Sequence, residues 1–98
     1  MSTAEGNSIV INIVENFSVE AAGQFRESAK EYVEKGTTNF VLDFSSCKFI
    51  DSTGLGVIVG IYKKCLEHKG TVKLQHLNAD VLKVFKMTRL DKVFEIQP

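Results

Sequence analysis

Apolar and polar positions alternate along the chain with two different periods, which divide it into predicted strands and helices. Short runs that are rich in β-branched residues, or that alternate with period two, are typical of strands. Such runs cover residues 8–14, 39–44, 71–77 and 93–96. Apolar residues three and four positions apart are typical of amphipathic helices. This spacing covers residues 19–35, 53–69 and 80–87.

The order of these elements predicts the fold class. Strands and helices alternate, beginning and ending with a strand, and this order indicates an α/β domain. We expect a mixed, mostly parallel sheet of about four strands, with three or four helices packed on it. The 98 residues allow one domain with one core, spanning 1–98. Within it, residues 1–7 are expected to be a loose N-terminal end, with a short edge pairing as the alternative.

The strand over 39–44 is predicted to be central and covered on both faces, because it is short and almost entirely apolar. Asp43 is its exception, since a carboxylate inside such a strand is costly unless it lies near the exposed end or finds donors. The loop over 45–53 follows the carboxyl end of this strand. Ligand sites of open α/β sheets are found there, so this loop is the expected position of a functional site.

The helix over 53–69 is apolar around nearly its whole circumference. Such a helix is either deeply buried or partly offered to a partner. Gly56 and Gly60 stand four residues apart on one face, and we expect them to let the backbone approach the sheet closely. Leu55 and Val59 are candidate contacts for a partner, with a place in the core as the alternative.

The ends of the two long helices carry recognisable capping residues. Ser18 fits an N-cap of the helix over 19–35, because its side-chain oxygen could accept from a backbone amide of the first turn. Gly36 and Gly70 are expected to stop the two helices, since glycine readily takes the left-handed conformation at a helix end.

Composition narrows the class of function. Twelve Lys and Arg balance twelve Asp and Glu, which argues against a nucleic-acid or anionic-membrane surface because those need a basic excess. The chain opens without a signal-peptide pattern, and its longest apolar run is far short of a membrane span. Cys47 and Cys65 are too few and too arbitrarily spaced for a disulfide framework or a zinc site. We therefore expect two reduced thiols in a cytoplasmic protein.

The turn Asp51-Ser52-Thr53-Gly54 stands where an apolar run gives way to the second helix. These residues are common caps and turn formers, so a purely structural role is one interpretation. A nucleophilic Ser52 would need a base, but His68 lies at the far end of the same helix, roughly 22 Å from its predicted start at Thr53, and His76 lies in a strand pattern that favours a structural role. The turn lacks the Lys-Ser/Thr ending of a phosphate loop, and two nearby carboxylates are weak evidence for a metal. We expect neither an enzyme nor a metal site.

Reversible modification is the chemistry that remains open to the turn. A serine at a helix start is accessible and can be phosphorylated, which adds a charge of about −1.5 to −2. Here the phosphate would stand beside Asp51 and near Asp43, and a partner docked over the turn would meet new charge and bulk. Ser52 is the first candidate. Thr53 is the lesser candidate, because its hydroxyl lies one residue further into the helix.

The stretch F-I-D-S-T-G-L-G-V-I-V-G (residues 49–60), followed by Tyr62-Lys63, resembles the signature of the STAS domain. It is most similar to the anti-sigma factor antagonists of bacterial partner-switching systems. Residues 40–44, with an acidic residue at the fourth place, resemble the family's preceding strand. Residues 73–78 and 81–85 resemble its later strand and helix. The similarity covers roughly residues 8–96.

This resemblance implies a cytoplasmic binding protein without a cofactor or small-molecule substrate of its own. The unphosphorylated form would bind an anti-sigma factor that is also a histidine-kinase-like serine kinase, and so release the sigma factor. The kinase would use ATP to phosphorylate Ser52 and abolish binding, and a PP2C-like metal-dependent phosphatase would reset the switch. The expected docking surface comprises Asp43, Asp51, Ser52, Thr53, Gly54, Leu55, Gly56 and Val59.

Two departures from the family pattern bear on the choice of partner more than on the fold. Ser18 stands where the family often has Asp, which would weaken the acidic wall beside the switch. Thr88-Arg89-Leu90 stands where family members often have Thr-Gly-Leu or Ser-Gly-Leu. The alternative function is a STAS scaffold or regulatory subunit in another signalling, secretion or lipid-transport complex, and the sequence alone leaves it open.

Overall fold

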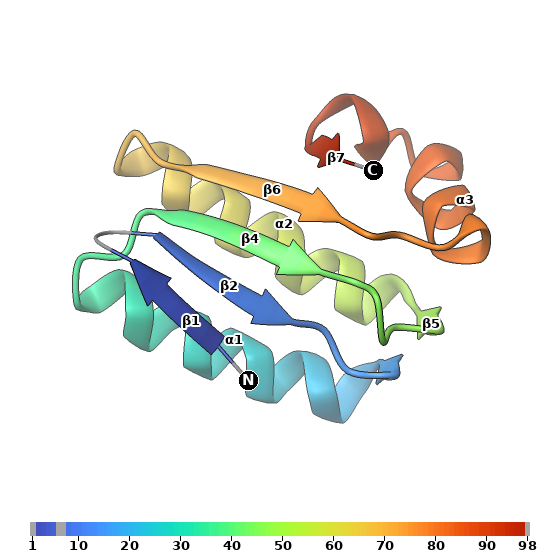
Figure 1. Cartoon of the computed structure of the whole chain (residues 1–98), viewed down its shortest axis with the longest axis horizontal. Coiled ribbons are helices and arrows are strands. Elements are labelled where there is room, and N and C mark those ends of the chain that lie inside the picture. Colours follow the sequence, from blue (N-terminus) through green and yellow to red (C-terminus); the bar gives the residue numbers. More distant parts are fainter. Residues whose placement is uncertain (1, 6–7, 98) are drawn as a thin grey trace.

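The strands of the main sheet run parallel apart from one edge. In the computed structural model, which describes residues 2–5 and 8–97, five strands lie in the order β1-β2-β4-β6-β7 (Figure 1). Strands β2, β4, β6 and β7 pair in parallel, and β1 pairs antiparallel with β2. Their bounds are β1 (Ser2–Glu5), β2 (Ser8–Asn12), β4 (Asn39–Asp43), β6 (Thr71–Gln75) and β7 (Glu95–Gln97). The predicted mixed, mostly parallel α/β sheet is confirmed.

The N-terminal segment adds a strand that the sequence offered only as an alternative. Residues 1–7 were expected to form a loose end, yet Ser2 to Glu5 pair in register with β2, from Ser2 opposite Ile11 to Glu5 opposite Ser8. The edge pairing is thus found for this part of the segment. Positions 1, 6 and 7 lie outside the described residues, as does position 98.

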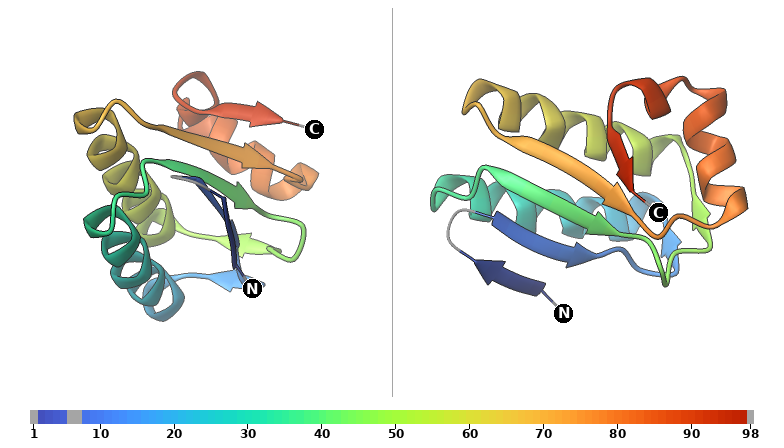
Figure 2. Two further views of the ribbon diagram at one scale, coloured as in Figure 1. Left: turned by 60° about the vertical axis from the view of Figure 1, so that its left-hand side comes forward. Right: turned by 45° about the horizontal axis from the view of Figure 1, so that its top comes forward.

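Two long helices cover one face of the sheet. Helices α1 (Val19–Glu34) and α2 (Ser52–Glu67) lie side by side on that face (Figure 2). Phe40 and Leu42 of β4 point toward them and are fully buried, whereas Val41, on the opposite face of the same strand, is half-buried. The prediction that this strand is covered on both faces is therefore wrong, because neither long helix reaches the second face.

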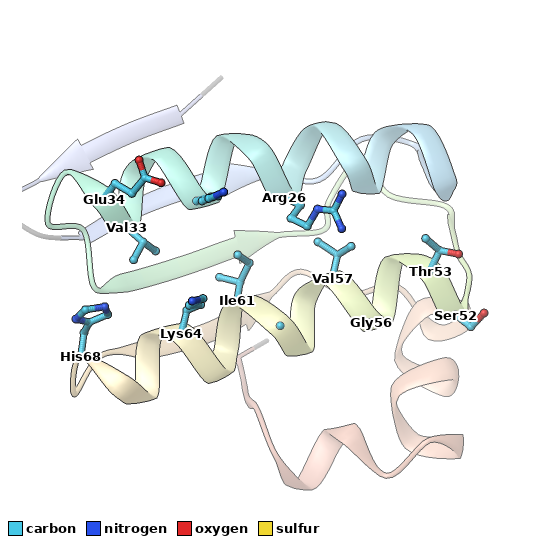
Figure 3. A pocket seen from close by; sticks show the side chains of 12 residues that line it. Arg26, Val33, Glu34, Ser52, Thr53, Gly56, Val57, Ile61, Lys64 and His68 are labelled. Atoms are coloured by element: carbon cyan, nitrogen blue, oxygen red, sulfur yellow. The ribbon is translucent and has the colours of Figure 1, made fainter.

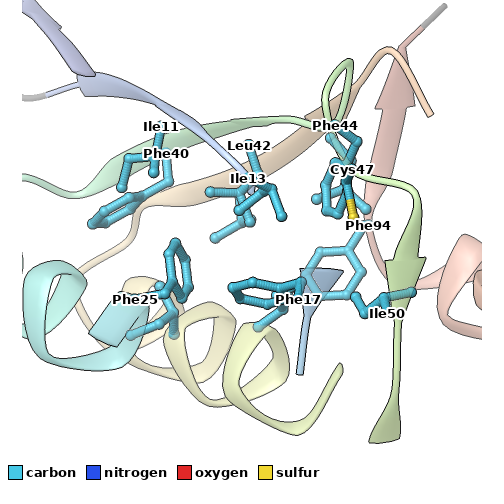
Figure 4. Packing of buried hydrophobic residues seen from close by; sticks show 14 of the residues in the cluster. Ile11, Ile13, Phe17, Phe25, Phe40, Leu42, Phe44, Cys47, Ile50 and Phe94 are labelled. Carbon is cyan, nitrogen blue, oxygen red and sulfur yellow. The ribbon is translucent and has the colours of Figure 1, made fainter. Parts of the chain in front are cut away.

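The core fills the space between the sheet and the two helices with aliphatic and aromatic side chains (Figure 4). Phe17 and Phe25 meet edge to face at 5.4 Å between ring centroids, and Phe44 meets Phe85 in the same way at 5.8 Å. Such pairs pack well because the positive edge of one ring meets the negative face of the other. Phe44 directly follows β4, so the Phe44–Phe85 pair lies at the carboxyl end of this strand, where the loop that leads to β5 begins.

The last third of the chain closes that end of the core. Helix α3 (Ala79–Met87) confirms the predicted short helix, and the 3-10 turn η1 (Leu90–Lys92) leads into β7. The final strand begins later than predicted, because buried Phe94 packs against Phe85 and Tyr62 just before it. Arg89 takes a left-handed backbone with φ 62°. Glycine adopts this conformation without strain, which explains why a glycine fits this place.

A second, two-stranded sheet was missed in the sequence. Strand β3 (Asn16–Phe17) lies between the predicted strand over 8–14 and the predicted helix over 19–35, and it pairs in parallel with β5 (Phe49–Ile50). Two residues are too few to show any periodicity. This small sheet matters for function because β5 delivers the chain directly to the start of α2.

The helix ends follow the predicted caps only in part. Gly36 has φ 102° and ends α1 as expected. Ser18 is the N-cap residue of α1, but its side chain makes no capping hydrogen bond. At the end of α2, Lys69 rather than Gly70 takes the left-handed conformation. Gly70 is required for another reason, since a Cβ there would collide with the carbonyl of Thr38.

Candidate functional site

The start of α2 lies at the carboxyl edge of the main sheet, where the sequence predicted a site. Strand β4 ends at Asp43, a short loop leads to β5, and α2 begins directly after β5 (Figure 1). The parallel strands all end at this edge, so the turn is presented beyond the sheet rather than on its face.

A single capping bond fixes the geometry of the turn. Asp51 is the N-cap of α2, and its carboxylate accepts a hydrogen bond of 3.0 Å from the backbone amide of Gly54. Ser52 becomes the first residue of the helix, one residue earlier than predicted. Its side chain is exposed, and within the described part of the chain no hydrogen bond uses its hydroxyl. The serine therefore lies at a capped helix start with its hydroxyl exposed.

Thr53 shares this accessibility. The sequence placed its hydroxyl one residue further into the helix, but Thr53 is exposed and makes no hydrogen bond through its side chain among the described residues. Its side chain rises from α2 toward α1, whereas Ser52 lies at the end of α2 and points outward there (Figure 3), and both residues line the space between the two helices. Exposure alone does not separate the two hydroxyls, although their directions do.

Gly54 is the glycine that permits close packing at this site. A Cβ on Gly54 would lie 2.6 Å from the carbonyl oxygen of Phe17 and 2.7 Å from its ring, which leaves room for no side chain. The sequence assigned this close approach to Gly56 and Gly60, and that prediction is wrong. Both are exposed, and a Cβ on either would meet nothing within 4 Å.

The apolar residues around the turn differ in how much surface they offer. Leu55 is only 8% exposed and belongs to the core, and Val59 is half-buried. More apolar surface is found where the sequence did not point: Phe49, three residues before Ser52, is 53% exposed. Aromatic side chains are enriched in protein interfaces, so Phe49 is a candidate contact for a protein partner.

Asp43 lies in a polar cluster at the carboxyl end of β4. Its carboxylate accepts from the backbone amide of Ser45 at 2.8 Å and from the amide of Gln75 at 2.9 Å, and it contacts Nδ1 of His76 at 3.0 Å. Burial alone would raise the pKa of Asp43, but these bonds from Ser45, Gln75 and His76 together lower it well below its ordinary value. No bond among the described residues joins Asp43 to Asp51 or Ser52.

Sequence reasoning missed two supports of this region. Gln75 lies opposite Asp43 because β4 and β6 are five-residue strands paired in register. Asn78 caps α3 by accepting from Val81, and it also donates to the carbonyl of Cys47 at 2.9 Å. This second bond connects α3 to the loop that leads to β5, and it could not be predicted from the local sequence.

Metal-ligating, cysteine and histidine side chains were also compared with the predictions. The described residues contain no group of three or more His, Cys, Asp or Glu that could hold a metal ion. Cys47 and Cys65 are buried and free, and burial raises the pKa of the Cys65 thiol to about 11. His68 caps the far end of α2, and His76 serves as a partner of Asp43. No helix in the described ranges has the length and apolar character needed to cross a bilayer.

Asp43→Asn should lower the free energy of unfolding at neutral pH by about 1–3 kcal/mol, because amide donors would lose their ionised acceptor. The native carboxyl has a pKa below the reference value of 3.8. Its contribution is therefore complete above that value and disappears as pH falls toward the native pKa. Urea titrations of both proteins at pH 7 and pH 3 should show the difference shrinking at pH 3. Glu27→Gln, an exposed change on α1, is the control, and an equal difference at both pH values would contradict the assignment.

Comparison with known proteins places this geometry in a family. A model described as the STAS domain matches residues 1–98. The chain belongs to the STAS-domain family. An anti-sigma-B factor antagonist of Bacillus subtilis (strain 168) is 31% identical over 90 residues, which covers 92% of this chain and 82% of that protein. The resemblance seen in the sequence is confirmed.

Solved structures of other proteins share this fold. The crystal structure of a proposed anti-sigma factor antagonist from Thermotoga maritima has a TM-score of 0.88 and 27% identity, covering 98% of this chain and 83% of that one. The Bacillus antagonist SpoIIAA, in its unphosphorylated form, has a TM-score of 0.80 and 20% identity, covering 98% and 84%. At that identity the likeness to SpoIIAA shows the fold alone.

Proposed function

We propose that this STAS domain is an anti-sigma factor antagonist that is switched by phosphorylation of Ser52. Unphosphorylated, it binds an anti-sigma factor with serine kinase activity and thereby releases a sigma factor. The kinase then uses ATP to phosphorylate Ser52, and a PP2C-like phosphatase restores the first state. The chain acts as a cytoplasmic binding protein rather than an enzyme, and it needs no cofactor of its own.

The observation that carries this proposal is the free, exposed hydroxyl of Ser52 at the first position of α2. A kinase can reach such a hydroxyl without unfolding any part of the domain. The relative named anti-sigma-B factor antagonist supports the class of partner. The STAS signature around Asp51 and Ser52 supports the position of the phosphate.

The local charges explain why a phosphate at Ser52 would act on the partner rather than on the fold. The positive end of the helix dipole favours an anion at this place, while the neighbouring Asp51 carboxylate opposes one. These two effects partly cancel, so the domain keeps its shape. A partner packed over Ser52 and Phe49 would have to bury about two negative charges, which is strongly unfavourable.

Incubation with the purified anti-sigma factor of the source cell and ATP should add about 80 Da, the mass of one phosphoryl group. Phosphopeptide mapping should place it on Ser52 and not on Thr53. Ser52→Ala should bind the anti-sigma factor like the parent chain but resist modification. A phosphate confined to another residue, with the kinase active on a control substrate, would overturn the proposed site.

Ser52→Asp should bind the anti-sigma factor at least about tenfold more weakly, since placing one uncompensated charge in an interface costs more than about 1.4 kcal/mol. Isothermal titration calorimetry measures this directly. The same experiment with Thr53→Asp tests the lesser candidate. The Thr53 side chain lies on the side of α2 toward α1. A Ser52→Asp protein that binds as tightly as the parent chain would contradict the charge mechanism.

A further inference from the structure

A groove of about 870 Å³ runs between α1 and α2, from Ser52 at one end to His68 at the other (Figure 3). Those ends are sixteen residues apart on α2, or about 24 Å along a helix. The groove is thus long enough to hold a partner helix of about four turns. The end of the groove at Ser52 and Thr53 belongs to the proposed switch, whereas its length from Val57 to His68 does not.

The floor of the groove is smooth and apolar. Val57 and Ile61 of α2 and Val33 of α1 line it, together with Gly56 and Gly60. Glycine is the least favourable residue in a helix interior after proline, and both glycines have open space where a Cβ would stand. The packing of this domain therefore gives no reason for either glycine. Two glycines four residues apart on one helix face would let the backbone of a second helix approach closely.

The rim of the groove is cationic. Arg26 and Lys30 of α1 and Lys64 of α2 line it, with Glu34 as the opposing charge. None of these four side chains makes an ion pair among the residues that the structure describes. The whole chain has a formal net charge of 0, so the positive excess is local to this surface. A ligand that matches it carries negative charge.

We propose that the α1–α2 groove receives an amphipathic helix of the anti-sigma factor, with an apolar stripe on the glycine floor and acidic flanks against the cationic rim. This inference rests on the proposed function, because it names a second contact for the same partner. Binding in the groove is thereby coupled to the phosphorylation state of Ser52. A phosphate on Ser52, at the end of the groove, repels an acidic helix, so phosphorylation weakens both contacts.

Gly60→Leu is the sharpest variant, because leucine favours the helix but fills the floor of the groove. Its unfolding midpoint in urea should not fall, while its affinity for the purified anti-sigma factor should drop by more than about tenfold. Lys30→Glu and Lys64→Glu should each weaken binding by about tenfold and reduce its dependence on salt. Lys63→Glu is the matched control, since its neighbour Lys64 lines the groove and Lys63 does not.

A photo-crosslinking residue at position 68 identifies the occupant. After irradiation of the complex, mass spectrometry should find it joined to an Asp- and Glu-rich amphipathic segment of the anti-sigma factor. A cross-link to a second copy of this chain, or to a segment without acidic residues, would overturn the proposal. So would groove variants that bind like the parent chain while Ser52→Asp loses binding. The reverse pattern, with groove variants impaired and Ser52→Asp unimpaired, contradicts the phosphorylation switch and leaves the groove contact standing.

Discussion

Replacing Gly54 with alanine should destabilise the domain by about 1–3 kcal/mol, although alanine is the better helix former by about 1 kcal/mol. The added Cβ would lie 2.6 Å from the carbonyl oxygen of Phe17 and 3.0 Å from a side-chain carbon of Ile50. Phe17 is 2% exposed and belongs to the small β3–β5 sheet, so neither its backbone nor its ring can move away cheaply. Urea denaturation measures the loss.

The same substitution should also impair the switch. To relieve the collision, the first turn of α2 has to move away from β3, and Ser52 moves with it. We therefore expect slower phosphorylation of Ser52 and weaker binding to the anti-sigma factor, in addition to the lower stability. Phosphorylation and binding both require the Ser52 hydroxyl to lie in its native position.

Gly56→Ala is the matched control, two residues further along the same helix. A Cβ at this place meets nothing within 4 Å, so the change should stabilise the domain by about 1 kcal/mol through helix propensity alone. If the Gly54→Ala protein were as stable as the Gly56→Ala protein, the close contact with Phe17 would not be real, and the proposed anchoring of the switch turn would fail with it.

The long elements of this fold could be predicted because each carries its own period. The stripe of Ala22, Phe25 and Ala29 repeats at helical spacing, and these three residues are the buried ones of α1. The alternating pattern of β6 likewise places Val72 and Leu74 in the core. Such elements can be predicted because the burial pattern of a single helix or strand appears in its own sequence as a hydrophobic period.

Contacts between distant segments could not be read in the same way. Nothing near Gly54 says that the backbone of Phe17 lies against it, because β3 is two residues long and its pairing with β5 depends on the whole fold. The two exposed glycines of α2 were assigned to packing against the sheet for the same reason. Spacing shows which residues share a helix face, but the face that meets the sheet is set by the larger side chains around them.

The position of the candidate switch in the chain could be predicted, but the contacts around it could not. The acidic hydroxyl turn after a central strand indicated Asp51 and Ser52 from local chemistry, and the resemblance to a family sharpened the choice. The bonding partners of Asp43 could not be predicted in the same way. The bonds of Asp43 run to Gln75 and His76 at the end of β6, because parallel pairing places those residues beside it, whereas the turn is reached only after β5.

Phe85→Ala should lower the free energy of unfolding by about 3–5 kcal/mol, the usual range for removing a fully buried phenylalanine. Phe85 is 0% exposed and meets Phe44 and Phe94 edge to face, at 5.8 and 6.2 Å between ring centroids. The loss is a large part of the roughly 5–15 kcal/mol that holds such a domain together. Thermal unfolding followed by circular dichroism should show a much lower midpoint.

The loss should also reach the switch turn, because Phe85 anchors the helix that supports it. With α3 loosened, the bond from Asn78 to the carbonyl of Cys47 is lost, and the loop leading to β5 gains freedom. We therefore expect weaker binding to the anti-sigma factor even at temperatures where the variant is folded. Met87→Ala, on the same helix and 74% exposed, should change stability by less than about 0.5 kcal/mol. Equal stability of the two variants would mean that α3 is not packed as described, and unchanged binding by a folded Phe85→Ala protein would show that α3 does not support the turn.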